Sequence, residues 1–254
     1  MSSSHSFAIR ILSRLRMYPH RFFLLRIGPQ KLLEYDEMMA AADLQSDNSV
    51  LDIGCGTGVQ TLLLGKKCRQ VVGVDISDEA ISLARGRAAS SMMLDIVDFV
   101  RADAAHLSFE KGSFDRILSF CVLEHIPNWR EVLSNTCEWL SPNGYLVISV
   151  DSLATLNDAE VIKKHRQDFS VISYFDCDAL ESALQGAGYT DIELKPILRS
   201  EHAKQWFTEA VLAGATERRN IIGSFGEYLR LRGSDKKASE VKQGIFIIAK
   251  AKAK

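Results

Sequence analysis

The sequence predicts an α/β fold in which a mostly parallel sheet carries helices on both faces. From Ser49 onwards, short apolar runs alternate with helix-like segments, a pattern typical of βαβ units with right-handed crossovers. Three alternating glycines, Gly54, Gly56 and Gly58, follow the first apolar run, and the second run ends in an acid, Asp75. A glycine turn followed by an acid at the tip of the next strand is typical of a nucleoside-binding half-sheet.

The elements follow from apolar runs and from start and stop signals. The expected strands cover residues 50–53, 71–75, 97–101, 114–120, 145–150, 191–194 and 244–250. The expected helices cover residues 30–42, 59–67, 78–90, 129–140 and 178–185, with further helices within 199–232. Ser77 is a typical N-cap before two acids, and the Pro-Asn-Gly turn at residues 142–144 precedes the fifth strand.

Composition is that of one globular domain. The chain has 254 residues, 46% hydrophobic and 25% charged, enough for a large core. Its longest aliphatic and aromatic runs, such as residues 22–25, have four residues, too few to span a bilayer. The five scattered cysteines form no C-x-x-C pair, which favours a reduced, cytoplasmic setting.

Charge is distributed unevenly along the chain. Residues 1–33 hold six basic side chains and no acid, and residues 199–254 hold 12 bases against six acids. Residues 34–198 between them hold 26 acids against 13 bases. An acidic body of this kind does not resemble a nucleic-acid surface, so we expect no nucleic-acid partner.

The glycine turn also indicates which nucleoside binds. A dinucleotide fingerprint reads G-x-G-x-x-G, whereas here the third glycine, Gly58, comes one residue early. Asp52, two residues before the first glycine, would repel a pyrophosphate but suits a cationic ammonium or sulfonium. S-adenosyl-L-methionine carries both groups. Asp75, 21 residues after Gly54, is placed to accept the hydroxyls of its ribose.

The segment Leu51-Asp-Ile-Gly-Cys-Gly-Thr-Gly58 resembles the first motif of the class I S-adenosylmethionine-dependent methyltransferases, specifically the small-molecule type. The resemblance covers residues 50–194 and extends to the last strand. It implies a Rossmann-like sheet of seven strands, mostly parallel, with an antiparallel last strand. One domain over residues 1–254 is then expected.

The expected domain has four parts. They are a helical N-terminal lid (1–42), a cofactor-binding core (50–195), a helical insertion (196–243) and the last strand (244–250).

The resemblance also implies roles for residues at the strand tips. Gly54, Gly56 and Gly58 would lie under the amino-acid half of S-adenosylmethionine, with Cys55 as a small residue beside it. Asp52 would face the cofactor's ammonium.

Residues after the second, third and fourth strands complete this binding site. Asp75 would hold the ribose, and Ile76 would pack on the adenine. Asp103 and Ala104 resemble an adenine clamp, although Asp103 could instead cap a turn. A backbone carbonyl of Phe120 or Cys121 would meet the cofactor's ammonium.

Histidines are the candidate bases. His125, after the fourth strand, comes first because imidazole titrates near neutrality, and His165 comes second. Tyr174 is a weaker third. The alternatives are a hydrogen bond that shapes the loop, or catalysis by alignment alone.

No metal site is expected from sequence. The metal-dependent catechol type would need an acid at the tip of the fourth strand, where Phe120 and Cys121 stand. Asp151 alone makes no metal site.

The basic N-terminus allows three interpretations. Phe7, Ile11 and Leu15 share one helical face, which favours a lid over the cofactor cleft. The alternatives are peripheral membrane contact through residues 1–33 and a targeting peptide, which we rank last.

The predicted function is methyl transfer to an O, N or C atom of a small-molecule or lipid-like acceptor. The competing hypotheses are a catalytically silent cofactor-binding module and, less favoured, a nicotinamide-dependent oxidoreductase. The sequence does not predict an oligomeric state.

Overall fold

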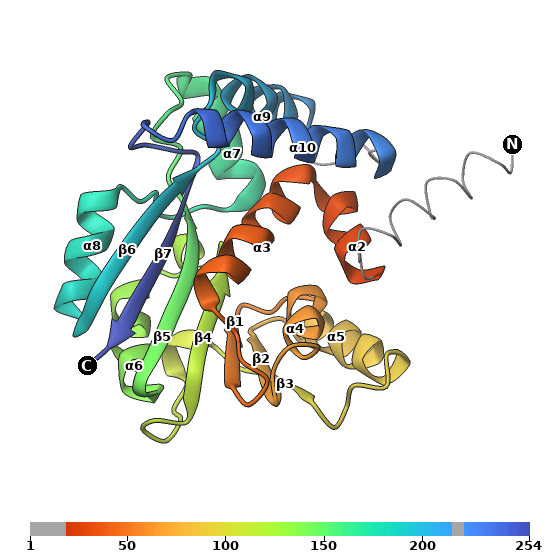
Figure 1. Cartoon of the computed structure of the whole chain (residues 1–254), viewed down its shortest axis with the longest axis vertical. Coiled ribbons are helices and arrows are strands. Elements are labelled where there is room, and N and C mark those ends of the chain that lie inside the picture. The colour runs from red at the N-terminus through yellow and green to blue at the C-terminus, as the bar shows by residue number, and fades with distance from the viewer. Residues whose placement is uncertain (1–18, 215–220) are drawn as a thin grey trace, which may run out of the picture.

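The protein is built around one seven-stranded sheet (Figure 1). The computed structural model describes residues 19–214 and 221–254. The strands are β1 (Ser49–Ile53), β2 (Gln70–Asp75), β3 (Val97–Arg101), β4 (Phe114–Phe120), β5 (Leu140–Asp151), β6 (Tyr189–Ile197) and β7 (Phe246–Ala253). Their order across the sheet is β3-β2-β1-β4-β5-β7-β6. Strands β1 to β5 pair in parallel, whereas β7 pairs antiparallel with β5 and β6, which confirms the predicted fold class.

Helices cover both faces of this sheet. They are α2 (Pro19–Ile27), α3 (Pro29–Ala42), α4 (Val59–Leu64), α5 (Asp78–Ser90), α6 (Trp129–Trp139), α7 (Ala159–Phe169), α8 (Cys177–Gly186), α9 (Glu201–Ala213) and α10 (Ile221–Lys237). Buried side chains of α3, α4 and α5 form the core on one face, and those of α6 and α8 form the core on the other. Helices α9 and α10 join the first of these cores, and α10 packs against α3 (Figure 1).

The central strand β1 is buried at every position. It pairs with β2 on one side and β4 on the other, so its carboxyl end opens where the chain order of the strands reverses. Ligands of open α/β sheets bind at such a point. The short 3₁₀ helices η1 (Ala104–His106) and η2 (Leu123–His125) follow β3 and β4 at the same edge.

Several elements differ from the sequence prediction. Helix α7 was not expected; Asp158 caps it by accepting hydrogen bonds from two backbone amides, but of its apolar residues only Val161 is fully buried. Strand β5 begins at Leu140 and passes through Asn143, whose positive φ of 66° lies in a register shift against β4. Strand β7 runs on to Ala253 because its lysines alternate with buried alanines, and the Lys250 ammonium lies 4.6 Å from the Tyr145 ring centroid.

The first described element of the N-terminal region is helix α2. Leu24 and Leu25 are fully buried, and α2 packs against α3, α4 and α10. The amphipathic face of Phe7, Ile11 and Leu15 lies outside the described residues. Among the residues that are described, no helix is both long and apolar enough to cross a membrane.

Candidate active site

The glycine turn after β1 is shaped by positive φ angles. Gly54, Gly56 and Gly58 have φ of 71°, 51° and 79°, values that favour glycine over other residues. A Cβ on Gly54 would lie 2.3 Å from a methyl of Val122, and one on Gly58 would lie 2.7 Å from the Phe99 ring. Nothing lies within 4 Å of a Cβ on Gly56, so the space above the turn is open. At Gly56 the turn therefore offers bare main chain to a ligand.

Asp52 is a buried acid with one free oxygen. Its side chain is 1% exposed, and it accepts a hydrogen bond of 2.6 Å from the Thr61 hydroxyl. Its other oxygen, Oδ1, has no partner among the described residues. Burial, followed by the nearby Asp75, raises the pKa of Asp52 to about 7, although the Thr61 hydrogen bond lowers it. A cation beside Asp52 would offset the free-energy cost of burying its ionised carboxylate.

Asp75 is held in place at the end of β2. Its two carboxylate oxygens accept hydrogen bonds of 2.8 Å from the Gly56 amide and 2.9 Å from the Ser77 amide. A carboxylate has further lone pairs, so both oxygens can still accept from a ribose. The neighbouring Ile76 is 63% exposed, which leaves its side chain free to cover an adenine. Cys55, in contrast, is buried.

Asp103 caps the turn after β3, the alternative that sequence analysis left open. It accepts from the Ala105 amide at 3.0 Å and pairs with His106 at 2.9 Å. The Ala105 hydrogen bond is the main reason that the pKa of Asp103 is lowered. Ala104 lies in the same 3₁₀ turn. The adenine-binding role of Asp103 and Ala104 stays a prediction.

The tip of β4 turns sharply at Cys121. Phe120 is buried and stacks on Tyr35 of α3, with ring centroids 6.2 Å apart. Cys121 has a positive φ of 52°, and its amide donates to the Ser149 carbonyl at 3.1 Å. The next residue, Val122, contacts Gly54, so this tip and the glycine turn are neighbours.

A cavity of about 400 Å³ opens beside this tip. Its polar lining includes Arg26, Lys31, Cys121, Glu124, His125, Asp151, His165 and Asp168, and its apolar lining includes Ile27, Phe169, Trp206, Phe207 and Phe246. Both predicted histidines therefore reach one cavity. A larger and more open hollow of about 1050 Å³ lies between residues 155–160 and α9, but none of the predicted site residues line it.

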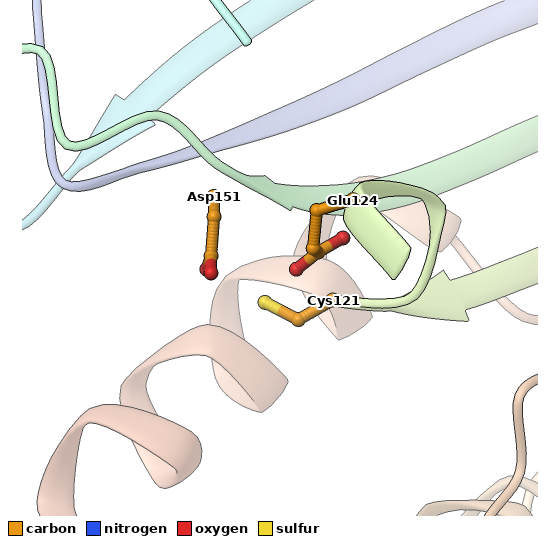
Figure 2. A group of neighbouring side chains, drawn as sticks. All are labelled: Cys121, Glu124 and Asp151. Carbon is orange, nitrogen blue, oxygen red and sulfur yellow. The ribbon is translucent and has the colours of Figure 1, made fainter. Parts of the chain in front are cut away.

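Buried acids gather at the inner end of this cavity (Figure 2). Glu124 is 0% exposed and neither of its carboxylate oxygens has a hydrogen-bond partner among the described residues. Burial, and then Asp151, raises the pKa of Glu124 well above its usual value. Burial also raises the pKa of Asp151 to about 6, although Lys31 lowers it. Burial raises the pKa of the Cys121 thiol in the same way.

Helix α3 supplies one cation to these acids. The Lys31 ammonium lies 2.9 Å from a carboxylate oxygen of Glu34, which is itself 1% exposed. The other Glu34 oxygen accepts from the Ser149 hydroxyl and from the Cys121 thiol. Burial lowers the pKa of Lys31, but the negative groups around it, Cys121, Glu34 and Asp151, raise it above its ordinary value.

The two predicted histidines differ in their surroundings. His125 is exposed to the cavity, and its Nδ1 lies 3.3 Å from the Ser170 carbonyl oxygen. His165 is 4% exposed; its Nδ1 lies 3.1 Å from the Tyr174 hydroxyl and its Nε2 3.7 Å from an Asp151 oxygen. Burial lowers the pKa of His165 to about 4, so it is neutral at physiological pH.

Sequence reasoning missed the acids and the lysine that surround these histidines. Lys31 and Glu34 stand three residues apart on α3, which is a common surface pattern and gave no signal. Glu124 was not among the candidates from sequence. Its backbone carbonyl accepts from the amides of residues 172 and 173, which are far along the chain.

A family model described as a methyltransferase domain matches residues 27–194. Among curated proteins, the chain is 33% identical over 115 residues to methyltransferase GfsG of Streptomyces halstedii, covering 45% of this chain and 41% of that protein. It is also 33% identical over 101 residues to the ubiquinone biosynthesis O-methyltransferase of Shewanella halifaxensis, covering 39% and 42%. The chain spans less than half the length of these two relatives.

The fold is similar to that of solved structures. The structure of an S-adenosylmethionine-dependent methyltransferase from Mesorhizobium loti superposes with a TM-score of 0.64 at 17% identity, covering 89% of this chain and all of that one. The glycine turn and the antiparallel β7 fit the same architecture. The chain therefore belongs to the methyltransferase domain family, among the class I S-adenosylmethionine-dependent methyltransferases.

Proposed function

We propose that this chain transfers the methyl group of S-adenosylmethionine to a small-molecule or lipid-like acceptor held in the 400 Å³ cavity. The observation that carries the proposal is the position of Cys121. Its backbone follows β4 beside the glycine turn, and the residue also lines the cavity. A cofactor lying on the turn would therefore direct its methyl group toward an acceptor in the cavity.

The cofactor would bind at the tips of the first four strands. The ammonium would lie near the free oxygen of Asp52 and a carbonyl of Phe120 or Cys121. Asp75 would accept the ribose hydroxyls, and the exposed Ile76 would cover the adenine. Support comes from Asp52 most of all, because a buried carboxylate whose only hydrogen bond among the described residues is from Thr61 is costly unless a cation pairs with it.

We favour a hydroxyl oxygen as the acceptor atom over nitrogen or carbon. The relative from Shewanella halifaxensis is named an O-methyltransferase. In the reaction, an O–C bond forms as the C–S bond breaks, and its electron pair stays on sulfur to give S-adenosylhomocysteine. The hydroxyl proton must leave, and a base is then useful. His125 is our first candidate, because it faces the cavity, and His165 is the second.

The cavity also bears on the kind of acceptor. Phe169, Trp206 and Phe207 give it aromatic walls, which suit an acceptor with a ring or an aliphatic chain. Helix α2 contributes Arg26 and Ile27 to the same cavity. This contribution supports the lid hypothesis for the N-terminal region. Contact with a membrane through residues 1–33 stays a second hypothesis.

An acceptor screen with methyl-labelled S-adenosylmethionine tests the proposal. The panel should contain aromatic and aliphatic acceptors in matched hydroxyl, amine and carbon-acid forms. We expect label in hydroxyl acceptors, with one S-adenosylhomocysteine formed per methyl transferred. Cofactor binding with no label in any acceptor would favour a silent cofactor-binding module. Label in the amines alone would contradict the oxygen preference but not methyl transfer.

A further inference from the structure

Potential metal ligands from separate elements converge at the inner end of the cavity. The sulfur of Cys121 and carboxylate oxygens of Glu124 and Asp151 lie within 4.8 Å of one another. Figure 2 shows the Cys121 sulfur and the carboxylates of Glu124 and Asp151 gathered around one space. Neighbouring ligands in a tetrahedral zinc site are about 3.5 Å apart, as bond lengths of about 2.0–2.3 Å require. Small side-chain rotations would therefore place these three atoms around one ion.

We propose that Cys121, Glu124 and Asp151, together with His165, form a binding site for a divalent cation of the zinc class. No metal site was expected from the sequence, because Asp151 has no acidic partner at Phe120 or Cys121. Cys121 follows β4, Glu124 lies in the η2 turn, Asp151 ends β5, and His165 lies on α7.

The Glu124 carboxylate is buried without a bonding partner among the described residues. Its side chain is 0% exposed, and both carboxylate oxygens lack a hydrogen-bond partner among the described residues. An isolated buried carboxylate is strongly unfavourable unless it is paired or binds a metal. Glu124 nevertheless lines the cavity, so an ion entering there can reach it.

His165 presents a lone pair toward the same place. The Tyr174 hydroxyl lies 3.3 Å from the Ile162 carbonyl and 3.1 Å from His165 Nδ1, and we assign it as donor to the carbonyl and acceptor of the proton on Nδ1. Nε2 is then unprotonated, and it faces an Asp151 oxygen 3.7 Å away. Two lone pairs at this distance repel each other unless a cation lies between them. A hydrogen bond from the second ring nitrogen is also the usual support for a metal-binding histidine.

The buried acids at this point carry enough negative charge to bind a divalent ion. The three buried carboxylates near this point are Glu34, Glu124 and Asp151. Lys31 pairs with Glu34 at 2.9 Å, and its ammonium lies 5.8 Å from the Phe246 ring centroid. When ionised as metal ligands, Glu124, Asp151 and the Cys121 thiolate together carry three formal negative charges, of which one divalent cation would neutralise two.

The backbone of the proposed ligands is already fixed. The Cys121 amide donates to the Ser149 carbonyl at 3.1 Å, and the Asp151 carbonyl accepts from the Phe175 amide at 2.9 Å. The Glu124 carbonyl accepts from the amides of Ile172 and Ser173. Ion binding would therefore reorient side chains without rebuilding the turns, which is the condition for a precise metal site.

The ligand set selects the class of ion. A thiolate and an imidazole suit Zn²⁺ and neighbouring transition metals, whereas Mg²⁺ and Ca²⁺ prefer oxygen ligands only. Because the site opens on the cavity, a further coordination position would be available to the acceptor. If the proposed methyl transfer is correct, the ion would hold the acceptor's oxygen near the cofactor's methyl group.

Cobalt substitution tests the site directly. The full chain is stripped with a chelator and titrated with Co²⁺, which reports thiolate ligation by a charge-transfer band in the near ultraviolet. We expect one equivalent of Co²⁺ to bind with this band, Zn²⁺ to displace it and Mg²⁺ to leave it. Cys121→Ser should lose the band, and Glu124→Gln and Asp151→Asn should each weaken Co²⁺ binding about tenfold or more.

A matched control is Cys137→Ser, which removes a thiol of similar burial in another part of the fold and should keep the band. The proposal is overturned if Co²⁺ gives no band with the wild-type chain, or if the band persists in Cys121→Ser. S-adenosylhomocysteine is titrated into the same stripped protein. Cofactor binding without Co²⁺ binding would overturn the metal site alone, and Co²⁺ binding without cofactor binding would overturn the proposed methyl transfer alone.

Discussion

On the proposed cofactor side of the site, nearby backbone amides hold Asp75 and Asp103, whereas on the proposed acceptor side the acids come together from distant segments. Asp75 accepts from amides at residues 56 and 77, and Asp103 accepts from the amide two residues later. Glu124 has no side-chain partner, and its position depends on residues 172 and 173. Asp151 faces His165, which is on another element.

This difference separates two tasks. A cofactor that is the same in every turnover can be bound by a turn and a few strand tips that are close in sequence. An acceptor that differs among enzymes requires a cavity, and the walls of the proposed acceptor cavity come from α2, α3, α7 and α9 as well as from the sheet. Changes on the cofactor side should therefore alter cofactor affinity, and changes on the acceptor side should alter turnover.

The largest effect is expected from the histidines of the cavity. Replacing the acting base, by His125→Gln or His165→Gln, should lower kcat by about 10²- to 10⁴-fold and leave the affinity for S-adenosylhomocysteine unchanged. Steady-state kinetics and calorimetry on the same preparations measure both quantities. His202→Gln is the control, because His202 pairs with Glu227 and does not line this cavity. Wild-type rates in both variants would leave alignment alone as the source of catalysis.

Asp75→Ala should lower cofactor affinity, in contrast to the histidine variants, which should lower turnover. Charge-assisted hydrogen bonds to the ribose are worth about 1.5–3 kcal/mol each, so cofactor affinity should fall by about tenfold or more. The fold should survive, since the partners of Asp75 are two backbone amides, Ser77 in its own turn and Gly56 in the glycine turn after β1. Calorimetry with S-adenosylhomocysteine measures the loss. An unchanged dissociation constant in the folded variant would remove Asp75 from the cofactor site.

Asp52 gives a pH-dependent prediction. Because burial raises its pKa from 3.8 to about 7, the folded chain without cofactor holds this proton more tightly than the unfolded chain. Stability should therefore fall as pH rises from about 4 to 7, by at most about 4 kcal/mol for this residue. Asp52→Asn cannot ionise, so its thermal stability relative to wild type should improve steadily over that range. The main charged neighbour in this argument is Asp75.

Thermal unfolding at several pH values, with and without S-adenosylhomocysteine, checks this prediction. At pH 8 the cofactor product should stabilise the wild type more than Asp52→Asn, because its ammonium would pair with the ionised acid. If the difference in stability between wild type and Asp52→Asn does not change with pH, the pKa of Asp52 is not raised by burial as described here.

The smallest effect tests the contribution of α2 to the acceptor side. Ile27 is 51% exposed and lines the cavity, so Ile27→Ala should raise KM for the acceptor a few-fold and leave cofactor affinity unchanged. Leu83→Ala on α5 is a matched control, since Leu83 is also 51% exposed but lies away from the cavity. Equal KM values for the two variants would argue against a lid role for α2.

The glycine turn and the elements around it were largely predictable from the sequence, for a physical reason. The glycine turn needs positive φ at Gly54 and Gly58, where a Cβ would clash with Val122 and Phe99, so the sequence itself carries the signal. Ser77 caps α5 as predicted, by accepting from the Ala80 amide. The strands between residues 50 and 120 were predicted for the same reason, because apolar runs bounded by turns are local patterns.

The acceptor side could not be predicted in the same way. Helix α7 has few fully buried apolar residues, and it brings His165 beside Asp151 only through tertiary packing. The pairing of Lys31 with Glu34, and the contact of Glu34 with Cys121, bring α3 onto the tips of β4 and β5. These contacts join residues up to about 90 positions apart along the chain, and no spacing rule indicates them.

Calorimetric titration of S-adenosylhomocysteine into the purified chain tests the central claim most directly. The account predicts saturable binding of one equivalent per chain, with no heat from NAD under the same conditions. Binding of NAD without binding of S-adenosylhomocysteine would contradict it, because the turn of Gly54, Gly56 and Gly58 beside the buried Asp52 would then hold a pyrophosphate and not a cationic methyl donor.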